Sequence, residues 1–264
     1  MEEEDALILV KRQVSIPKHI YLPGPCHLPA LASDLTAAFE VERARGAVLN
    51  NRQEIVSFKR LNDRVVELLK AYSLAGTGDW RQYAAWNEHS YLRHLLWATE
   101  EFEIMLLCWL PGQTSRVHTH ADSHCWFAVL AGEVRETQYR PFAGEERVSE
   151  ASLHAAADGV MDLVPTGIIN NSVGDVAYIN DRIAMHSVGC CARAHTNLTE
   201  DVRRPEQDVM RTALACTLHI YSPPIRRAKA LEGGKFMDCI PGFFSRHSIC
   251  VGSDPTKPAA IAKA

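Results

Sequence analysis

Three features are missing from this sequence, and each absence narrows the range of functions. No apolar run is long enough to span a bilayer, so we expect no membrane segment. The 28 Lys and Arg residues are outnumbered by 32 Asp and Glu and form no basic stripe, so we expect no nucleic-acid partner. The start of the chain, residues 1–5, is acidic and unlike a secretion signal. We therefore expect a cytoplasmic monomer whose partners are small molecules.

A disulfide framework is also missing. The chain has eight cysteines, but they are scattered at irregular spacing. We interpret them as reduced thiols, as is usual in the cytoplasm, and the adjacent Cys190 and Cys191 as ordinary loop or strand residues. With 264 residues, of which 47% are hydrophobic, the chain is long enough for one domain with a substantial core.

The N-terminal third has helical periodicity. Apolar residues recur at helical spacing over 31–42 and again over 51–72, where one face carries Ile55, Phe58, Leu61, Val65, Leu68 and Leu69. The aromatic-rich segment 79–97 predicts one or two short helices. We expect residues 1–98 to form a helical segment packed on the rest of the domain.

From residue 102 onward the pattern is that of short strands. Runs of β-branched and aromatic residues alternate with turns such as Pro165-Thr166-Gly167. The predicted strands are 102–110, 124–130, 134–139, 159–164, 176–179, 213–221 and 246–251. They predict a mainly β fold, an antiparallel barrel or jelly roll, over 99–251. Segments 142–158 and 192–210 are interpreted as insertions, and 252–264 as a flexible tail.

Two histidines two residues apart mark the candidate site. On a β-strand, His118 and His120 point to the same face, and two adjacent imidazoles are half of a metal site. With Gly112 and Gly132 they resemble the first motif of the cupin barrel, except that Cys125 replaces the usual glutamate. Loss of that carboxylate leaves only neutral imidazoles around a metal.

Two later segments carry further polar groups. The stretch from Gly174 to His186 resembles a degenerate second cupin motif, with His186 as a third ligand, although a single histidine after a strand is more often structural. Thr217, His219 and Tyr221 alternate along one strand and therefore face the same side. Such a row is either a hydrogen-bonded chain that positions the phenol or simply the wetter face of a strand.

An arginine follows the aromatic segment. The guanidinium of Arg93, next to Tyr91, is suited to gripping a carboxylate through two parallel hydrogen bonds. Taken alone, an arginine at such a position is more often a surface residue.

Together these segments resemble the cysteine dioxygenases, mononuclear iron enzymes of the cupin class, over residues 79–221. The matching segments, in order, are Leu107-Cys108-Trp109, His118-Thr119-His120, Asp122-Ser123-His124-Cys125, Arg135-Glu136-Thr137, Ala177-Tyr178-Ile179-Asn180-Asp181 and Leu218-His219-Ile220-Tyr221-Ser222-Pro223-Pro224. The chain departs from the family pattern in its two insertions and in Thr217, where a serine is usual.

The resemblance implies a metal site and a substrate site. It implies that His118, His120 and His186 bind Fe(II), that Arg93 grips the substrate carboxylate, and that Tyr91 is a second contact for that group. The remaining histidines have no assigned role, and His124, which points away from Cys125, is interpreted as structural; the others are His19, His27, His89, His94, His154, His195 and His247.

The resemblance also implies a catalytic group. Cys125 and Tyr221 match the pair that forms a thioether cross-link in eukaryotic members, and His219 holds the phenol of Tyr221 in place. The Ser222-Pro223 bond matches a cis peptide beside the site. The implied reaction adds both atoms of O2 to the thiol of L-cysteine, giving cysteine sulfinate, a step of cysteine catabolism and taurine biosynthesis.

Three alternatives stay open at this point. The enzyme is a dioxygenase of another thiol, 3-mercaptopropionate or cysteamine; or the chain is a non-catalytic cupin that binds a metal or a small ligand; or it is a purely structural barrel. Arg93 argues against cysteamine, which has no carboxylate, and Cys125 argues mildly against the mercapto acid. The three-histidine set argues against a structural barrel.

Overall fold

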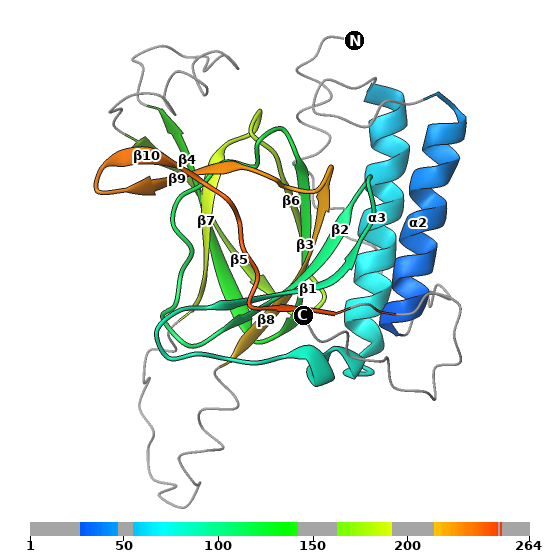
Figure 1. The fold of residues 1–264 in the computed structure, drawn as a ribbon, viewed down its shortest axis with the longest axis horizontal. Coiled ribbons are helices and arrows are strands. Elements are labelled where there is room, and N and C mark those ends of the chain that lie inside the picture. Colours follow the sequence, from blue (N-terminus) through cyan, green and yellow to red (C-terminus); the bar gives the residue numbers. More distant parts are fainter. Residues whose placement is uncertain (1–26, 47–54, 142–162, 192–213, 248, 250–264) are drawn as a thin grey trace, which may run out of the picture.

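Helices come first along the chain and strands follow. The computed structural model describes residues 27–46, 55–141, 163–191, 214–247 and 249 (Figure 1). Its elements are α2 (Leu28–Ala44), α3 (Ile55–Ala75), the short 3-10 helix η1 (Asp79–Tyr83), β1 (Leu92–Ala98), β2 (Glu103–Trp109), β3 (His124–Ala131), β4 (Glu133–Pro141), β5 (Leu163–Ser172), β6 (Val176–Ile179), β7 (Met185–Cys190), β8 (Ala215–Ser222), β9 (Ala228–Glu232), β10 (Lys235–Cys239) and β11 (Ser245–Arg246).

The described strands form three sheets. The largest has the order β11-β1-β2-β8-β3-β6, a second has the order β5-β4-β7, and β9 pairs with β10. Isolated bridges join the loop after β2 to the other sheets, for example between His118 and His186 and between His118 and Ala230. The predicted mainly β, cupin-type fold is confirmed. The sheets do not close into one continuous barrel, because the loop contributes single bridges instead of a strand.

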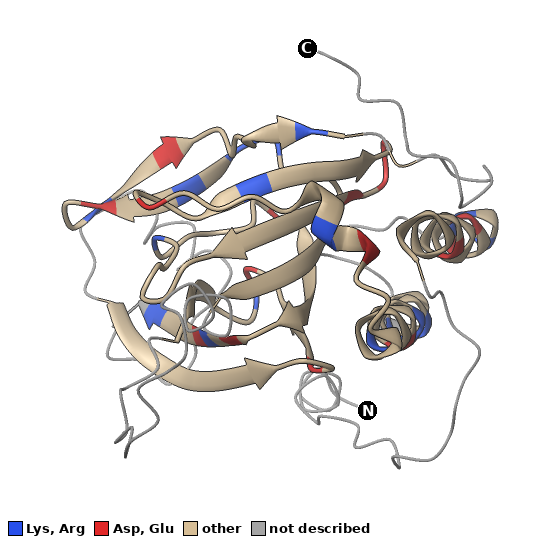
Figure 2. Cartoon of the chain, turned by 90° about the horizontal axis from the view of Figure 1, so that it is seen from below, with Lys and Arg blue, Asp and Glu red and all other residues tan. Residues whose placement is uncertain are grey.

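The two helices cover one face of the six-stranded sheet. They lie side by side, and α3 contacts β3 and β6 while α2 packs on α3 (Figures 1 and 2). The predicted apolar face of α3 is buried, with Leu61, Val65 and Leu69 at most 2% exposed. The indole Nε1 of Trp126 on β3 donates a hydrogen bond of 2.9 Å to Asn62 of α3. The Oγ of Ser73 donates a second hydrogen bond, of 2.6 Å, to the carbonyl of Val129, so polar contacts at two points along α3 anchor the helical layer within an apolar interface.

The central strands are buried on both faces. Every residue of β2 and β8 is buried. Because side chains alternate along a strand, Cys108 and Leu218 join the core beneath the helices, whereas Trp109 and Tyr221 belong to the core around the candidate site. One sheet thus separates the helical layer from the site and supplies residues to both.

The local predictions have mixed outcomes. The two long helices are confirmed, but the predicted helical segment 79–97 is helical only over Asp79–Tyr83 and continues as β1. The run 92–98 carries apolar residues on both faces besides Arg93 and His94, so it lacks the alternation that marks a half-buried strand. Segments 142–158, 192–210 and 252–264 lie outside the described residues.

Two further corrections concern the second sheet. The expected turn at 165–167 is part of β5, where a register shift opposite Gln138 and Tyr139 accommodates Pro165. β7, which carries His186, was not predicted, because its sequence Met-His-Ser-Val-Gly-Cys has no clear alternation. The division of the chain at residue 98 stays a prediction, although β1 lies before it and pairs with β2.

Charge and hydropathy are unremarkable in the part that is described. Lysines, arginines and acidic residues occur together on both strands and helices (Figure 2). Among the described helices, none has the length and apolar character needed to cross a membrane.

The helix–sheet interface yields the first testable prediction. Phe39 of α2 is fully buried, and its ring stacks on Phe102 with a centroid distance of 4.8 Å. We expect Phe39→Ala to lower the free energy of unfolding by about 3–5 kcal/mol through lost burial and the cavity left behind. Val41→Ala on the same helix is the matched control, since Val41 is 49% exposed and its change should stay within about 0.5 kcal/mol. Equal effects in urea denaturation would contradict this packing role.

Candidate active site

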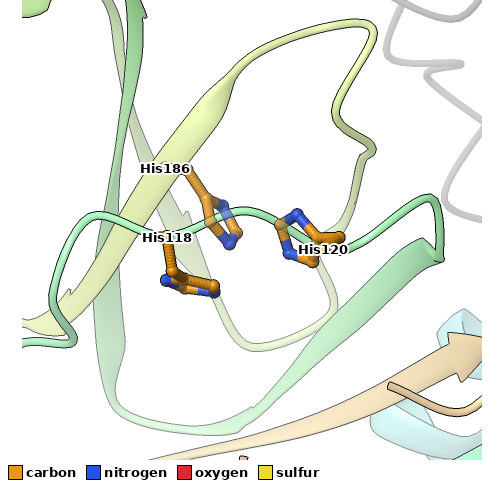
Figure 3. Close-up of side chains that lie close together, drawn as sticks. All are labelled: His118, His120 and His186. Carbon is orange, nitrogen blue, oxygen red and sulfur yellow. The ribbon is translucent and has the colours of Figure 1, made fainter. Parts of the chain in front are cut away.

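Three imidazoles converge where the loop after β2 meets β7. His118 and His120 come from the loop and His186 from β7 (Figure 3). Their ring centroids are 4.7–5.1 Å apart, and one nitrogen of each lies within 4.8 Å of the others. Of the described residues, these three form the only group of His, Cys, Asp or Glu side chains placed to hold a metal ion.

His118 and His120 do not owe their common orientation to a regular strand. They lie in an irregular loop, so the expectation of a regular strand is wrong. The backbones of His118 and His186 exchange two hydrogen bonds of 3.0 and 3.3 Å, which fixes the extended conformation at His118. Immediately after His120 the chain turns through Ala121 and Asp122, both with positive φ. A tight turn therefore ends the extended segment and lets β3 begin.

Behind the histidines lie two carboxylates that the sequence analysis did not single out. The Nδ1 of His186 is 2.8 Å from Oε1 of Glu136, and both side chains are buried. Asp181 accepts the backbone N–H of His120 at 2.6 Å, and its carboxylate lies 3.5 Å from Nδ1 of that ring. Hydrogen bonds of this kind fix the orientation of a ligating imidazole and increase its basicity.

Both carboxylates lie in segments that the sequence analysis names only as matches to the family pattern, without a role for either residue. Side chains alternate along β4, and Glu136 is a charged residue at a position that points inward. A charge at such a position is the sequence signal that could have identified it. Asp181 lies in the turn between β6 and β7, and nothing in its sequence surroundings identifies its contact with His120. Both contacts depend on tertiary structure.

His118 and His186 are neutral near pH 7. Burial, reinforced by the neighbouring imidazoles, holds the pKa of His118 and of His186 well below the usual value. Burial also raises the pKa of Glu136 to about 7. For Asp181, burial alone would raise the pKa, but hydrogen bonds and charge interactions with His120 outweigh it, and the net shift is downward.

The donor set fits a metal ion. His120 is fully buried, and its Nε2 has no hydrogen-bond partner among the described residues. Leaving a buried polar nitrogen unsatisfied costs about 1–3 kcal/mol, and a metal ion at the centre of the three rings removes that cost. Neutral imidazoles suit first-row metals such as iron, zinc or nickel, and three of them leave coordination positions open.

A cavity of about 660 Å³ opens beside the three rings. His118, His186 and Tyr221 line it, together with Arg93 and Tyr91. Arg93 is half-buried on β1, and no carboxylate of the described residues pairs with its guanidinium. Tyr91 stacks on Trp109 with a centroid distance of 4.3 Å. An unpaired positive charge in a cavity next to a metal-type site is suited to a small anionic ligand.

Thr217, His219 and Tyr221 face the same side of β8, as predicted, and all three are buried. The Oγ1 of Thr217 lies 2.9 Å from Nε2 of His219, whose Nδ1 lies 3.2 Å from the Oη of Tyr221. The indole Nε1 of Trp109 donates to Thr217 at 3.0 Å. The row is therefore a hydrogen-bonded chain that ends at the phenol and not a solvated strand face.

Cys125 is the cross-strand neighbour of Tyr221. The two residues are directly opposite in the β3–β8 pair, and the thiol lies 3.9 Å from Nδ1 of His219. Burial raises the pKa of both Cys125 and Tyr221 well above their usual values, so thiol and phenol stay protonated at neutral pH. The predicted cis bond between Ser222 and Pro223 is present at the end of β8.

The other histidine of this region has the predicted orientation. His124 points to the helical side of β3, opposite to Cys125, where its Nδ1 lies 2.6 Å from the hydroxyl of Tyr178 and its ring stacks on Phe58. The interpretation of His124 as structural agrees with these contacts.

Comparison with known proteins identifies sequence relatives over most of this region. A family model described as "Cysteine dioxygenase type I" matches residues 41–233. Cysteine dioxygenase type 1 of Danio rerio is 26% identical over 171 residues, which cover 64% of this chain and 69% of that protein. The protein of the same name from Rattus norvegicus is 28% identical over the same lengths.

Solved structures give weaker matches. An RmlC-like cupin protein from Desulfovibrio desulfuricans is 17% identical and has a TM-score of 0.31, with 54% of this chain and 91% of that chain covered. A double-stranded β-helix protein from Klebsiella pneumoniae is 12% identical, with a TM-score of 0.35 and 58% and 93% of the two chains covered.

The carboxylate behind His186 yields the second prediction. We expect Glu136→Gln to weaken Co²⁺ binding by about 10–100-fold, because a neutral amide makes the facing imidazole a poorer donor. Glu133→Gln is the matched control, since Glu133 lies on the same strand but is exposed. Co²⁺ affinity is measured by its absorbance in competition with a chelator. If both variants bind like the wild type, Glu136 has no such role.

Proposed function

The chain belongs to the cysteine dioxygenase type I family, and from this premise we propose that it oxidises the thiol of L-cysteine to cysteine sulfinate. The reaction adds O2 to the substrate, RSH + O2 → RSO2H, so both oxygen atoms end on sulfur and no other reductant is needed. The observation that carries the proposal is the shared cavity: two members of the three-histidine cluster, His118 and His186, line a space of about 660 Å³ together with Arg93, whose guanidinium forms no salt bridge with the described residues.

His118, His120 and His186 are the proposed ligands of a mononuclear Fe(II). Ferrous iron, when bound, supplies the redox chemistry and a double positive charge that favours a thiolate over a thiol. All three proposed ligands are neutral, so no carboxylate binds the metal directly and offsets that charge at the ion itself. Cys125, in place of a ligating glutamate, preserves this preference for an anionic sulfur ligand.

Arg93 is the proposed anchor of the substrate carboxylate. Its guanidinium forms no salt bridge with the described residues, so the carboxylate of the substrate is its proposed partner in the cavity. Tyr91, held flat against Trp109, is the proposed second contact. Two contacts at the carboxylate set which way the thiol and amine point, and this orientation is the main contribution of these residues to the rate.

Tyr221 is the proposed hydrogen-bond donor to the reacting groups. Its raised pKa keeps the proton on Oη, and the chain through His219 and Thr217 limits the rotation of the phenol. Cys125 restrains the same ring from the neighbouring strand, either as a thiol or through a thioether. A phenol already held in place loses less entropy when it engages the substrate.

Other thiols remain competing substrates within the same proposal. Cysteamine leaves Arg93 unpaired, and 3-mercaptopropionate satisfies Arg93 but has no amine. A binding-only cupin accounts for the histidines but assigns no purpose to the buried chain from Thr217 to Tyr221. We further propose that the protein acts in the cytoplasm as a monomer, without membrane or nucleic-acid partners.

Oxygen uptake by the Fe(II)-loaded protein tests the proposal directly. L-cysteine, cysteamine and 3-mercaptopropionate are supplied in parallel, and products are identified by mass. We expect L-cysteine to be the preferred substrate and to gain two oxygen atoms. His186→Ala is the inactive control and is expected to retain no stoichiometric iron. If protein shown to hold iron turns over none of the three thiols, the chain is a cupin that binds its ligand without catalysis.

The same assay tests the carboxylate anchor. We expect Arg93→Gln to lower kcat/KM for L-cysteine by about 10–100-fold, as for loss of a hydrogen bond between charged groups, and to leave cysteamine oxidation unchanged. Arg116→Gln is the matched control, because Arg116 lines the same cavity but is already paired with Glu232 at 2.5 Å. An equal loss of kcat/KM for L-cysteine and for cysteamine would show that Arg93 does not recognise the substrate carboxylate.

The cross-link has its own test. We expect purified wild-type protein to run as a doublet on a denaturing gel, the faster band carrying a thioether between Cys125 and Tyr221, and Cys125→Ser to run as one band with the fold retained. Digestion and mass spectrometry identify the linked peptide by the loss of two hydrogens. A single unlinked species in protein that has turned over cysteine contradicts the thioether.

A further inference from the structure

A second pair of cysteines lies on the opposite face of the sheet from the candidate site. Cys108 of β2 and Cys216 of β8 are directly opposite one another in the antiparallel pair, and their sulfur atoms are 3.7 Å apart. Both are fully buried in the core beneath the helices. Neither belongs to the cavity or to the chain that ends at Tyr221.

The backbone already has the spacing that a disulfide requires. Directly opposed residues of an antiparallel pair have Cα atoms about 4.5–5.5 Å apart, and disulfides occur at about 4.4–6.8 Å. Closing the bond therefore needs side-chain rotation that brings the sulfurs from 3.7 Å to about 2.05 Å, with no change in strand register. Both cysteines are free thiols in the structure.

The two thiols are chemically unequal. Cys216 donates its S–H to the sulfur of Cys108, and this hydrogen bond, opposed by burial and assisted by His94, lowers the pKa of Cys108 to about 6. The same contact raises the pKa of Cys216. His94 is held by Ser245, whose Oγ lies 2.7 Å from its Nδ1. Within the pair, Cys216 thus supplies the hydrogen and Cys108 the accepting sulfur, an arrangement suited to oxidation of a dithiol.

We propose that Cys108 and Cys216 form an oxidisable dithiol that a small hydroperoxide closes into a cross-strand disulfide. The sulfur of Cys108 attacks one oxygen of H2O2, which breaks the O–O bond and gives a sulfenic acid and water. The sulfur of Cys216 then displaces the hydroxyl group, which leaves as a second water. In total, two thiols and H2O2 give one disulfide and two waters, with two electrons passing from sulfur to peroxide.

Burial decides which oxidant reaches the pair. Cys108 lies beneath the half-buried backbone of Ala85, in the segment between η1 and β1. A molecule as small and uncharged as H2O2 passes such a cover during local opening, whereas a disulfide of peptide size needs the strands to separate. Two of the other thiols have different neighbours: Cys125 faces Tyr221, and Cys239 lies half-buried at the wall of the cavity.

The pair is coupled to the site through sequence neighbours. Trp109 and Thr217 directly follow the two cysteines, and their side chains are joined by the 3.0 Å hydrogen bond that begins the chain to His219. Rotation of the two cysteine side chains into a disulfide disturbs the residues that follow them, and with them this hydrogen bond, from the opposite face of the sheet. We therefore expect the disulfide to slow the oxidation of cysteine, a consequence that rests on the proposed function.

The covalent step is tested without any assay of turnover. The full chain, loaded with Zn²⁺ so that peroxide meets no redox-active metal, is titrated with H2O2 and digested under non-reducing conditions. We expect a linked peptide containing Cys108 and Cys216, two hydrogens lighter than the sum of its parts and lost on reduction. Oxidation confined to Cys191 or Cys239 would overturn the proposal.

Two substitutions separate chemistry from folding. In Cys216→Ser the linked peptide disappears and a sulfenic acid at Cys108 is trapped by dimedone. Cys216→Val, which fills similar space without a thiol, gives the same trapped product if serine impairs folding. Cys191→Ser is the control that still forms the disulfide. If dimedone labels no Cys108 in either variant, the assignment of Cys108 as the attacking sulfur is wrong.

The coupling is read in wild-type protein that is oxidised, freed of peroxide and reloaded with Fe(II). We expect at least a two-fold lower kcat for L-cysteine, restored by dithiothreitol and absent from Cys216→Ser. Unchanged turnover in protein shown to hold the disulfide overturns the coupling. The reduced sample measures cysteine oxidation without the disulfide. If that sample is inactive, the proposed function fails, and this result is distinct from a failure of the coupling.

Discussion

The burial of β8 on both faces is the constraint on which the rest of the structure depends. One strand supplies Thr217, His219 and Tyr221 to the cavity and alternating apolar residues to the core beneath the helices. A slip of one residue in its register would exchange these two sets. The pairing of β8 with β2 and β3 therefore holds the phenol, and the helical layer stabilises the site by fixing that register.

The metal-type cluster depends on a different principle, since two of its three histidines are not on regular strands. Their positions are set by contacts that cross between sheets: the backbone pair of His118 with His186, and the carboxylate of Asp181 against the backbone of His120. Glu136 holds His186 from within the second sheet. The orientation of each ring is thus determined by a partner far away in sequence. These contacts hold the histidines of an irregular loop in fixed positions, as strand pairing does for residues on a sheet.

The difference between local and long-range determinants explains which features were predictable. The apolar face of α3 and the alternation from Thr217 to Tyr221 are written in consecutive residues, and both were anticipated. The sequence of the run 92–98 predicts helix, because a strand that is mostly buried on both faces does not show the alternation of apolar and polar residues that marks a strand. Asp181 and the pair of Cys108 with Cys216 become visible only when distant segments are placed together. Sequence motifs identified the cluster, but not the groups that orient it.

Charge placement links the two halves of the candidate site. Three imidazoles give a bound divalent ion no ligating carboxylate, and Arg93 adds a further positive charge in the same cavity. Two positive charges in one cavity suit the substrate proposed above, which offers a thiolate to the metal and a carboxylate to Arg93. Tyr221, kept protonated by burial, adds a donor without adding charge. The proposed preference for a thiol that carries a carboxylate thus rests on the placement of positive charge among the described residues around the cavity.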